Sequence, residues 1–142
     1  EGALATGVEA AAEGSIAKDA PAGGFYQKPL LLDLPAEHEL IREEVFGPVL
    51  VIQPFDDEAH ALRLANGTPY GLVAGIWARG GARQRRPARK VQGGQGFINN
   101  YGAGGGVELP FGGVKHSGYG REKGFEALYG FTTLKTIAIH HG

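Results

Sequence analysis

The amino-acid sequence predicts an α/β fold with a mostly parallel, twisted open sheet and flanking helices. The first observation is a near-continuous apolar run at 49–53, which is typical of a strand covered on both faces in a parallel sheet. The second is a helical segment at 56–66, followed by a further apolar segment at 72–77. Strand, helix and strand with short connections indicate a right-handed βαβ crossover. The expected sheet has about four strands.

Length and composition suit one globular segment. The chain has 142 residues, 42% of them hydrophobic, which is enough for a core. A formal net charge of −1 gives no global argument for a nucleic-acid or membrane partner. We find neither an apolar run of roughly 18 residues nor a signal-peptide pattern. The absence of cysteine excludes disulfides and thiolate chemistry within this chain, and it fits a cytoplasmic protein.

Three short elements are expected before the first buried strand. The alanine-rich segment 3–12 predicts a short helix, and the Gly- and Pro-containing segment 14–24 predicts a loop. The aromatic and apolar segment 25–32 predicts a strand at a sheet edge, because Pro29 cannot donate a ladder hydrogen bond. Residues 33–40 predict a turn followed by one helical turn.

The helix at 56–66 has both a start and a stop signal. Three acidic residues open it, where Asp caps free N–H groups and negative charge suits the positive end of the helix dipole. Asn66-Gly67 stops it, and Pro69 prevents it from resuming. Its apolar face is formed by Ala61, Leu62, Leu64 and Ala65.

The next helix is expected at 79–90, where six of twelve residues are basic. A solvated helix face explains these charges better than phosphate contacts do, because no aromatic residue interleaves and the whole chain is not basic. Pro87 inside this helix should cost about 3 kcal/mol. The remaining expected elements are a strand at 95–99, a glycine-rich loop at 101–106, a helix at 121–129 and a closing strand at 134–139.

A proline-stiffened turn at 43–49 joins carboxylates and a phenyl ring to the apolar run. Gly47 can adopt backbone angles closed to other residues, and Pro48 fixes its own φ and disfavours a helical Gly47. We expect the turn to hold Glu44 and Phe46 at the mouth of a strand, where α/β proteins place ligand-binding groups. Spacing alone favours a capping role for Glu44.

Other candidate sites have structural explanations. The glycine cluster at 102–107 follows a strand, but its third glycine is out of register for a dinucleotide-binding loop and no helix pattern follows. The cluster at 118–124 precedes a helix but follows a loop. We therefore expect tight turns at both places. No metal site is expected, because metal-ligand spacing is missing around His38, His60, His116, His140 and His141. Glu108 could act as a base, but it lacks a partner carboxylate.

Four motifs, in order and with matching spacing, resemble those of the NAD(P)-dependent aldehyde dehydrogenases. Residues 44–49 are similar to Glu-x-Phe-Gly-Pro-Val, and residues 66–72 are similar to Asn-x-x-x-Tyr-Gly-Leu. Phe-Ile-Asn-Asn at 97–100 and Pro-Phe-Gly-Gly-Val-Lys-x-Ser-Gly at 110–118 complete the series. The match covers roughly the last two thirds of the chain. The first third is compatible with the same pattern, so 1–142 resembles the C-terminal part of such a catalytic domain.

The resemblance implies roles for individual residues. Glu44 would accept hydrogen bonds from the nicotinamide-ribose hydroxyls, for which a carboxylate offers two oxygens. Phe46 would lie against the nicotinamide of NAD or NADP and limit its movement. Lys115 and the Pro-Phe-Gly-Gly loop would be architectural. The strand at 134–139 would take part in subunit association.

The resemblance also implies what this chain lacks. The family's nucleophilic Cys, general-base Glu, oxyanion-binding Asn and coenzyme domain belong upstream of the matched segment. We therefore expect a C-terminal fragment that supplies no catalytic residue, is inactive alone and does not bind NAD(P) tightly. In the full-length enzyme an aldehyde would be oxidised to a carboxylic acid.

The alternative is a truncated, non-catalytic relative that acts as a binding or self-associating module. An α/β sheet separated from its neighbours exposes edges that can pair with another chain. Homo-oligomers through sheet edges are expected in either case. Neither nucleic acid nor membrane is an expected partner.

Overall fold

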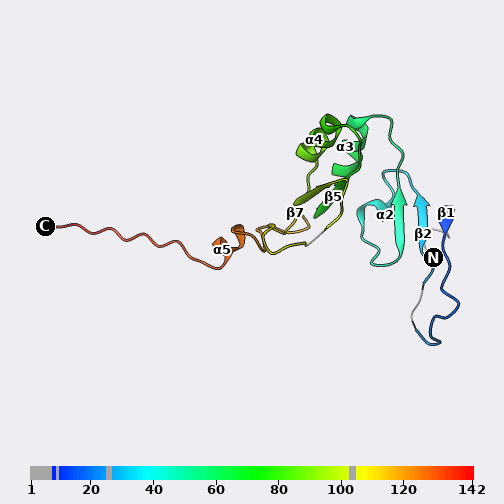
Figure 1. The fold of residues 1–142 in the computed structure, drawn as a ribbon, viewed down its shortest axis with the longest axis horizontal. Helices are drawn as coiled ribbons and strands as arrows, with labels where there is room; N and C mark the ends of the chain where they lie inside the picture. Colours follow the sequence, from blue (N-terminus) through cyan, green and yellow to red (C-terminus); the bar gives the residue numbers. More distant parts are fainter. Residues whose placement is uncertain (1–7, 9, 25–26, 103–104) are drawn as a thin grey trace. The chain divides into compact units, whose positions relative to one another are not determined.

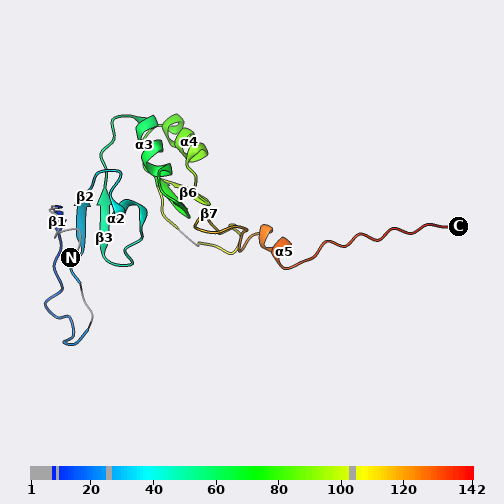
Figure 2. The same cartoon turned by 180° about the vertical axis from the view of Figure 1, so that it is seen from behind.

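The computed structural model describes residues 8, 10–24, 27–102 and 105–142. The chain divides into two compact units, Glu1–Leu64 and Ala65–Gly142. Each unit combines short helices with small sheets (Figures 1 and 2). This composition confirms the predicted α/β class.

The first unit contains a three-stranded sheet in the order β1-β2-β3, formed by β1 (Ala10–Glu13), β2 (Leu30–Asp33) and β3 (Val49–Ile52). The β1–β2 pair is antiparallel, and the β2–β3 pair is parallel with Leu30 opposite Val49. The short helix α2 (Glu39–Arg42) lies in the connection between β2 and β3. The central place of β2 contradicts the predicted edge strand. Pro29 precedes β2 instead of lying within it, so its missing N–H removes no ladder bond.

The helix predicted at 3–12 is wrong for the residues of this segment that the structure describes. Residues 10–12 belong to β1, and most of the rest of 3–12 lies outside the described residues. Pairing with β2 overrides the helix propensity of alanine, which is only a weak preference. The strand expected at 25–32 begins at Leu30, and residues 25–26 lie outside the described part of the chain.

Only one face of β3 is covered in this chain. Val49 and Val51 are half-buried, whereas Leu50 is 67% exposed and Ile52 is 38% exposed. The expectation that this strand is covered on both faces is therefore wrong for the chain by itself. Among the described residues the buried apolar core consists of Leu32 and Leu34. A strand with a period of two can bury one row of side chains while the other row remains open.

The helix α3 (Glu58–Asn66) confirms the element expected at 56–66. The βαβ crossover expected around it is wrong, because β3 and the next long strand, β5, belong to different sheets. A βαβ arrangement occurs later in the chain instead. The strands β5 (Val73–Ile76) and β6 (Gln95–Ile98) are parallel neighbours, and α4 (Gly81–Lys90) connects them and contacts both.

The second unit also contains the antiparallel pair β4 (Tyr70–Gly71) and β7 (Val114–Lys115) and the short helix α5 (Glu126–Gly130). The described strands thus form three separate sheets, not one sheet of about four strands. Helix α5 begins five residues later than the helix expected at 121–129. The described helices include none that is long and apolar enough to cross a membrane.

The glycine at position 94 is required by a close backbone approach. A Cβ atom there would overlap the carbonyl oxygen of Gly112. Gly96, two residues further along in β6, has open space on the corresponding side. Close packing therefore explains the glycine at position 94, whereas nothing in the structure explains Gly96.

Residues 132–142 form no helix or strand in the single chain. Leu134, Ile137 and Ile139 are 97%, 72% and 71% exposed. The strand expected at 134–139 is therefore wrong for the chain alone, because it has no partner strand among the described residues. A strand needs a neighbour to pair its backbone groups. Its formation on subunit association stays a prediction.

Candidate functional site

The 43–49 turn is held at both ends by backbone hydrogen bonds. At its start, Glu43 N donates to Glu39 O at 2.8 Å and closes α2. At its end, Leu30 N donates to Pro48 O at 2.8 Å, immediately before Val49 begins β3. The side chains between these two anchors are exposed to solvent. The fold therefore fixes the position of a turn whose side chains are available for contacts.

Glu44 and Phe46 are both accessible on this turn. Glu44 is exposed, and Phe46 is 88% exposed. The left-handed backbone angle falls on Phe46, with φ of 49°, and not on Gly47 as expected. A non-glycine residue in this region costs roughly 1–2 kcal/mol. Such strain persists only where the surroundings impose it, and it concentrates at functional sites.

The turn lies at the amino end of β3, since it precedes that strand. Binding sites of open parallel sheets lie at the carboxyl ends of the strands. The general rule used to place Glu44 and Phe46 at a binding edge therefore does not apply to them. Their candidacy rests on exposure, on the backbone strain at Phe46 and on the family motif.

Two of the recognised motifs meet in the second unit and form what we call the motif block, residues 66–72 and 110–118. The Lys115 ammonium donates to Asn66 O at 2.8 Å and to Thr68 O at 3.0 Å. Gly71 N donates to Ser117 Oγ at 2.9 Å, and His116 N donates to Pro69 O at 2.9 Å. These bonds, with the β4–β7 pairing, give Lys115 the architectural role that the resemblance implied.

The side chain of Asn66 joins the end of α3 to the end of α4. Its Nδ2 donates to Lys90 O at 3.1 Å, and its Oδ1 accepts from Gln92 N at 2.8 Å. Sequence reasoning assigned Asn66 to the end of a helix and to the first position of a family motif. No local pattern could have revealed these bonds, because the partners are 24 and 26 residues away.

The Pro-Phe-Gly-Gly loop is also fixed by internal contacts. Phe111 and Glu122 exchange backbone hydrogen bonds, each at 2.6 Å. Arg121 Nη1 donates to Gly113 O at 3.0 Å, and Gln95 Nε2 donates to Pro110 O at 2.9 Å. The glycine cluster that follows takes left-handed angles at Gly118, Gly120 and Gly124. Tight turns are therefore observed there, as expected.

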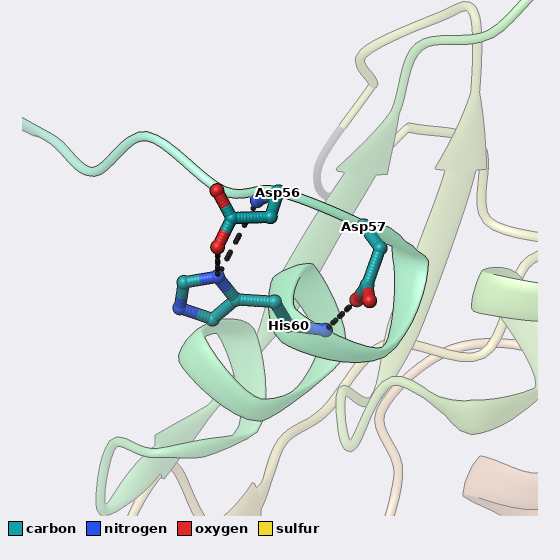
Figure 3. Close-up of polar contacts among 3 residues, drawn as sticks. All are labelled: Asp56, Asp57 and His60. Carbon is teal, nitrogen blue, oxygen red and sulfur yellow. Dashed lines mark hydrogen bonds and ion pairs between the residues drawn. The ribbon is translucent and has the colours of Figure 1, made fainter.

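The isolated histidines have local partners. His38 Nδ1 accepts from Leu40 N at 3.1 Å and caps α2. His60 Nδ1 lies 3.2 Å from Asp56 Oδ2, while His60 N donates to Asp57 Oδ1 at 2.7 Å, so that Asp57 caps α3 (Figure 3). The His116 ring lies edge-on to Tyr70. In the described part of the chain, His, Asp and Glu form no group of three that could hold a metal ion.

Comparisons with known proteins agree with the arrangement of the motifs. The model of the "Aldehyde dehydrogenase family" matches residues 1–137. The NADP/NAD-dependent aldehyde dehydrogenase PuuC of Escherichia coli strain K12 is 47% identical over 110 residues, which are 78% of this chain and 22% of that protein. The chain therefore spans less than a third of the relative's length.

Solved structures show the same relation. The crystal structure of an inferred aldehyde dehydrogenase from Burkholderia cenocepacia is 68% identical, with a TM-score of 0.89, and the match covers 99% of this chain and 30% of that one. An NAD⁺ complex of aldehyde dehydrogenase from Bacillus cereus is 34% identical, with a TM-score of 0.82, over 94% of this chain and 26% of that one. Fold and sequence thus agree over nearly the whole segment, and the chain belongs to the aldehyde dehydrogenase family.

Proposed function

We propose that this chain is the C-terminal segment of the catalytic domain of an NAD(P)-dependent aldehyde dehydrogenase. In the full-length enzyme it supplies Glu44 and Phe46 to the nicotinamide end of the cofactor site. The observation that carries this proposal is the exposed pair on the anchored 43–49 turn, with a strained backbone at Phe46.

The residues on this turn fit the chemistry of a nicotinamide riboside. An exposed carboxylate can accept hydrogen bonds from two neighbouring ribose hydroxyls, and charge-assisted bonds of this kind are roughly twice as strong as neutral ones. An exposed phenyl ring two residues away offers an apolar surface for the flat face of a nicotinamide. Because the turn is anchored at Glu43 and Pro48, little ordering of the backbone is needed when the cofactor binds.

The bound cofactor would accept a hydride from the substrate. This chain's part is to hold and orient the cofactor, because it contains no cysteine to attack an aldehyde. We therefore propose that the chain is inactive alone and that the full-length enzyme oxidises an aldehyde in the cytoplasm. Association of subunits through sheet edges, including residues 134–139, belongs to the same proposal.

The direct test compares Glu44→Gln with Glu43→Gln in the full-length polypeptide from the same source. Glu44→Gln removes the charge but keeps the shape, and we expect the KM for NAD or NADP to rise about tenfold to a hundredfold, as for a lost charge-assisted hydrogen bond. Glu43→Gln makes the same change at the neighbouring exposed position and should leave KM within about twofold. Phe46→Ala should weaken cofactor binding as well.

A second assay examines the 142-residue chain by itself. Cofactor reduction at 340 nm with a panel of aldehydes should show no turnover, and titration calorimetry should detect no tight cofactor binding. Equal KM values for Glu44→Gln and Glu43→Gln in the full-length enzyme would remove Glu44 from the site. Turnover by the 142-residue chain would contradict the proposal that this chain is inactive alone.

A further inference from the structure

The 43–49 turn has two anchors of unequal strength. The Pro48 carbonyl accepts from Leu30 N at 2.8 Å, directly before the parallel pairing of β2 with β3. This anchor is therefore continuous with a sheet. The Glu43 amide depends instead on α2, since it donates to Glu39 O at 2.8 Å and closes that helix. Opening of α2 would release the start of the turn.

Helix α2 has little to stabilise it besides its cap. It comprises one turn, Glu39–Arg42, and none of its residues is fully buried. Its apolar residues, Leu40 and Ile41, are only half-buried. Forming a first helical turn costs more backbone entropy than its few hydrogen bonds offset, so a helix this short needs support at its ends. At the N-terminus, that support comes from the side chain of His38.

His38 caps α2 through its ring. Its Nδ1 accepts from Leu40 N at 3.1 Å, and its backbone is extended, with φ of −65° and ψ of 142°, as is usual for an N-cap residue. The His38 carbonyl accepts from Ile41 N at 3.0 Å, and its N–H donates to Pro35 O at 3.0 Å. The ring bond is partly shielded from water. One residue thus connects the preceding turn with α2.

We propose that His38 is a positioning residue for the cofactor: by capping α2 it holds the Glu43 anchor, and thereby Glu44 and Phe46. This role rests on the proposed function of the turn. Without the cap, the start of the turn is released for part of the time, and only the ordered fraction binds the nicotinamide riboside. Cofactor affinity should therefore fall. The step after binding should be unaffected, because bound cofactor favours the ordered turn.

The test measures the cofactor KM and the kcat of His38→Ala in the full-length enzyme. We expect KM for NAD or NADP to rise about fivefold, as for the loss of one helix cap, and kcat to stay within about twofold. His38→Asn should keep KM within about twofold of the parent, because asparagine is a preferred N-cap residue whose side-chain oxygen accepts the same kind of bond. A general loss of stability would instead lower the amount of active enzyme, and so the apparent kcat, without raising KM.

The matched control is Asp57→Ala. Asp57 caps α3 by the same kind of bond, because its Oδ1 accepts from His60 N at 2.7 Å (Figure 3). Helix α3 follows β3 and provides neither anchor of the turn. Asp57→Ala should therefore lower the melting temperature about as much as His38→Ala does, but leave KM unchanged. An equal rise in KM for both variants would overturn the proposal, since the loss of any cap would then suffice.

Hydrogen–deuterium exchange of the full-length enzyme without cofactor gives a readout besides activity. The peptide that contains the Glu43 amide should exchange about fivefold faster in His38→Ala than in the parent or in Asp57→Ala, because its bond to Glu39 opens more often. Unchanged exchange there would overturn the proposal, as would an unchanged KM in His38→Ala when Glu44→Gln raises it. If Glu44→Gln also leaves KM unchanged, the proposed function of the turn fails, and the exchange measurement alone decides whether His38 holds the turn.

Discussion

The motif block and the 43–49 turn both carry motifs of the aldehyde dehydrogenase family. They differ in whether the side chains of the motif are bonded within the chain or exposed to solvent. In the block, Lys115, Ser117 and Asn66 are bonded within the second unit itself. On the turn, Glu44 and Phe46 are exposed, and Phe46 adopts a backbone angle unfavourable for its type. The named polar groups of the block are therefore paired within the second unit, whereas the Glu44 side chain has neither a hydrogen bond nor an ion pair among the described residues.

This difference separates two reasons for a motif to exist. A motif whose polar atoms are satisfied internally contributes to stability, and its loss should lower the free energy of unfolding. A motif whose side chains are exposed and make no such bonds is available for binding, and its loss should leave stability unchanged or improve it. The left-handed backbone angle does not separate the two motifs, because Lys115 in the block shares it with Phe46. Three substitutions test this distinction, and they are taken in decreasing order of the change in stability that we expect.

The largest effect is expected for Gly94→Ala at the edge of the motif block. Gly94 N donates to Gly71 O at 3.1 Å, and a Cβ would overlap the backbone of Gly112. Because backbone atoms on both sides would have to move, we expect a loss of more than about 3 kcal/mol in the free energy of unfolding. Urea denaturation followed by circular dichroism measures it. The matched control is Gly96→Ala, which has open space and should stay within about 1 kcal/mol of the parent.

A smaller loss is expected for Lys115→Met, which keeps the length of the side chain but removes the ammonium. Two carbonyl oxygens, of Asn66 and Thr68, would lose a charged donor. Because both bonds are exposed to solvent, we expect about 1 kcal/mol of destabilisation by the same measurement. Lys135→Met in the exposed C-terminal segment makes the same chemical change and should alter stability by less than about 0.5 kcal/mol. Equal effects at both positions would mean that the Lys115 bonds do not hold the block together.

The smallest effect, with the opposite sign, is expected for Phe46→Asn. Asparagine tolerates the left-handed region, and little apolar burial is lost from a side chain that is 88% exposed. We expect the isolated chain to gain about 0.5–1 kcal/mol, while the full-length enzyme loses cofactor affinity. If the isolated chain is clearly destabilised, Phe46 packs for structural reasons and the contrast with the motif block fails.

The sequence predicted elements where the signals are local. The caps around Asp57 and the stop at Asn66 placed α3 almost correctly, and the apolar run at 49–53 identified β3. Exposure of Glu44 and Phe46 is consistent with the role that their motif implied. In each case the determining residues lie within a few positions of one another, so a short window contains the physical cause.

The predictions were wrong where the local structure depends on residues that are far away in the sequence. Residues 10–12 form a strand because β2 is available to pair with them, which alanine composition cannot reveal. The crossover around α3 failed because an apolar run does not specify which sheet it joins. Within the 43–49 turn, the strained angle fell on Phe46 because the anchors at Glu43 and Pro48 fix the path between them. Pairing and anchoring are tertiary properties.

The bridge made by Asn66 has a consequence for limited proteolysis. The connection from β5 to α4 passes through exposed residues 79–81, where trypsin can cut after Arg79. The two pieces would stay together, because β5 remains paired with β6 and Asn66 still forms hydrogen bonds with Lys90 and Gln92 at the C-terminal end of α4. A nick at this place should appear on a denaturing gel and be invisible by native gel filtration.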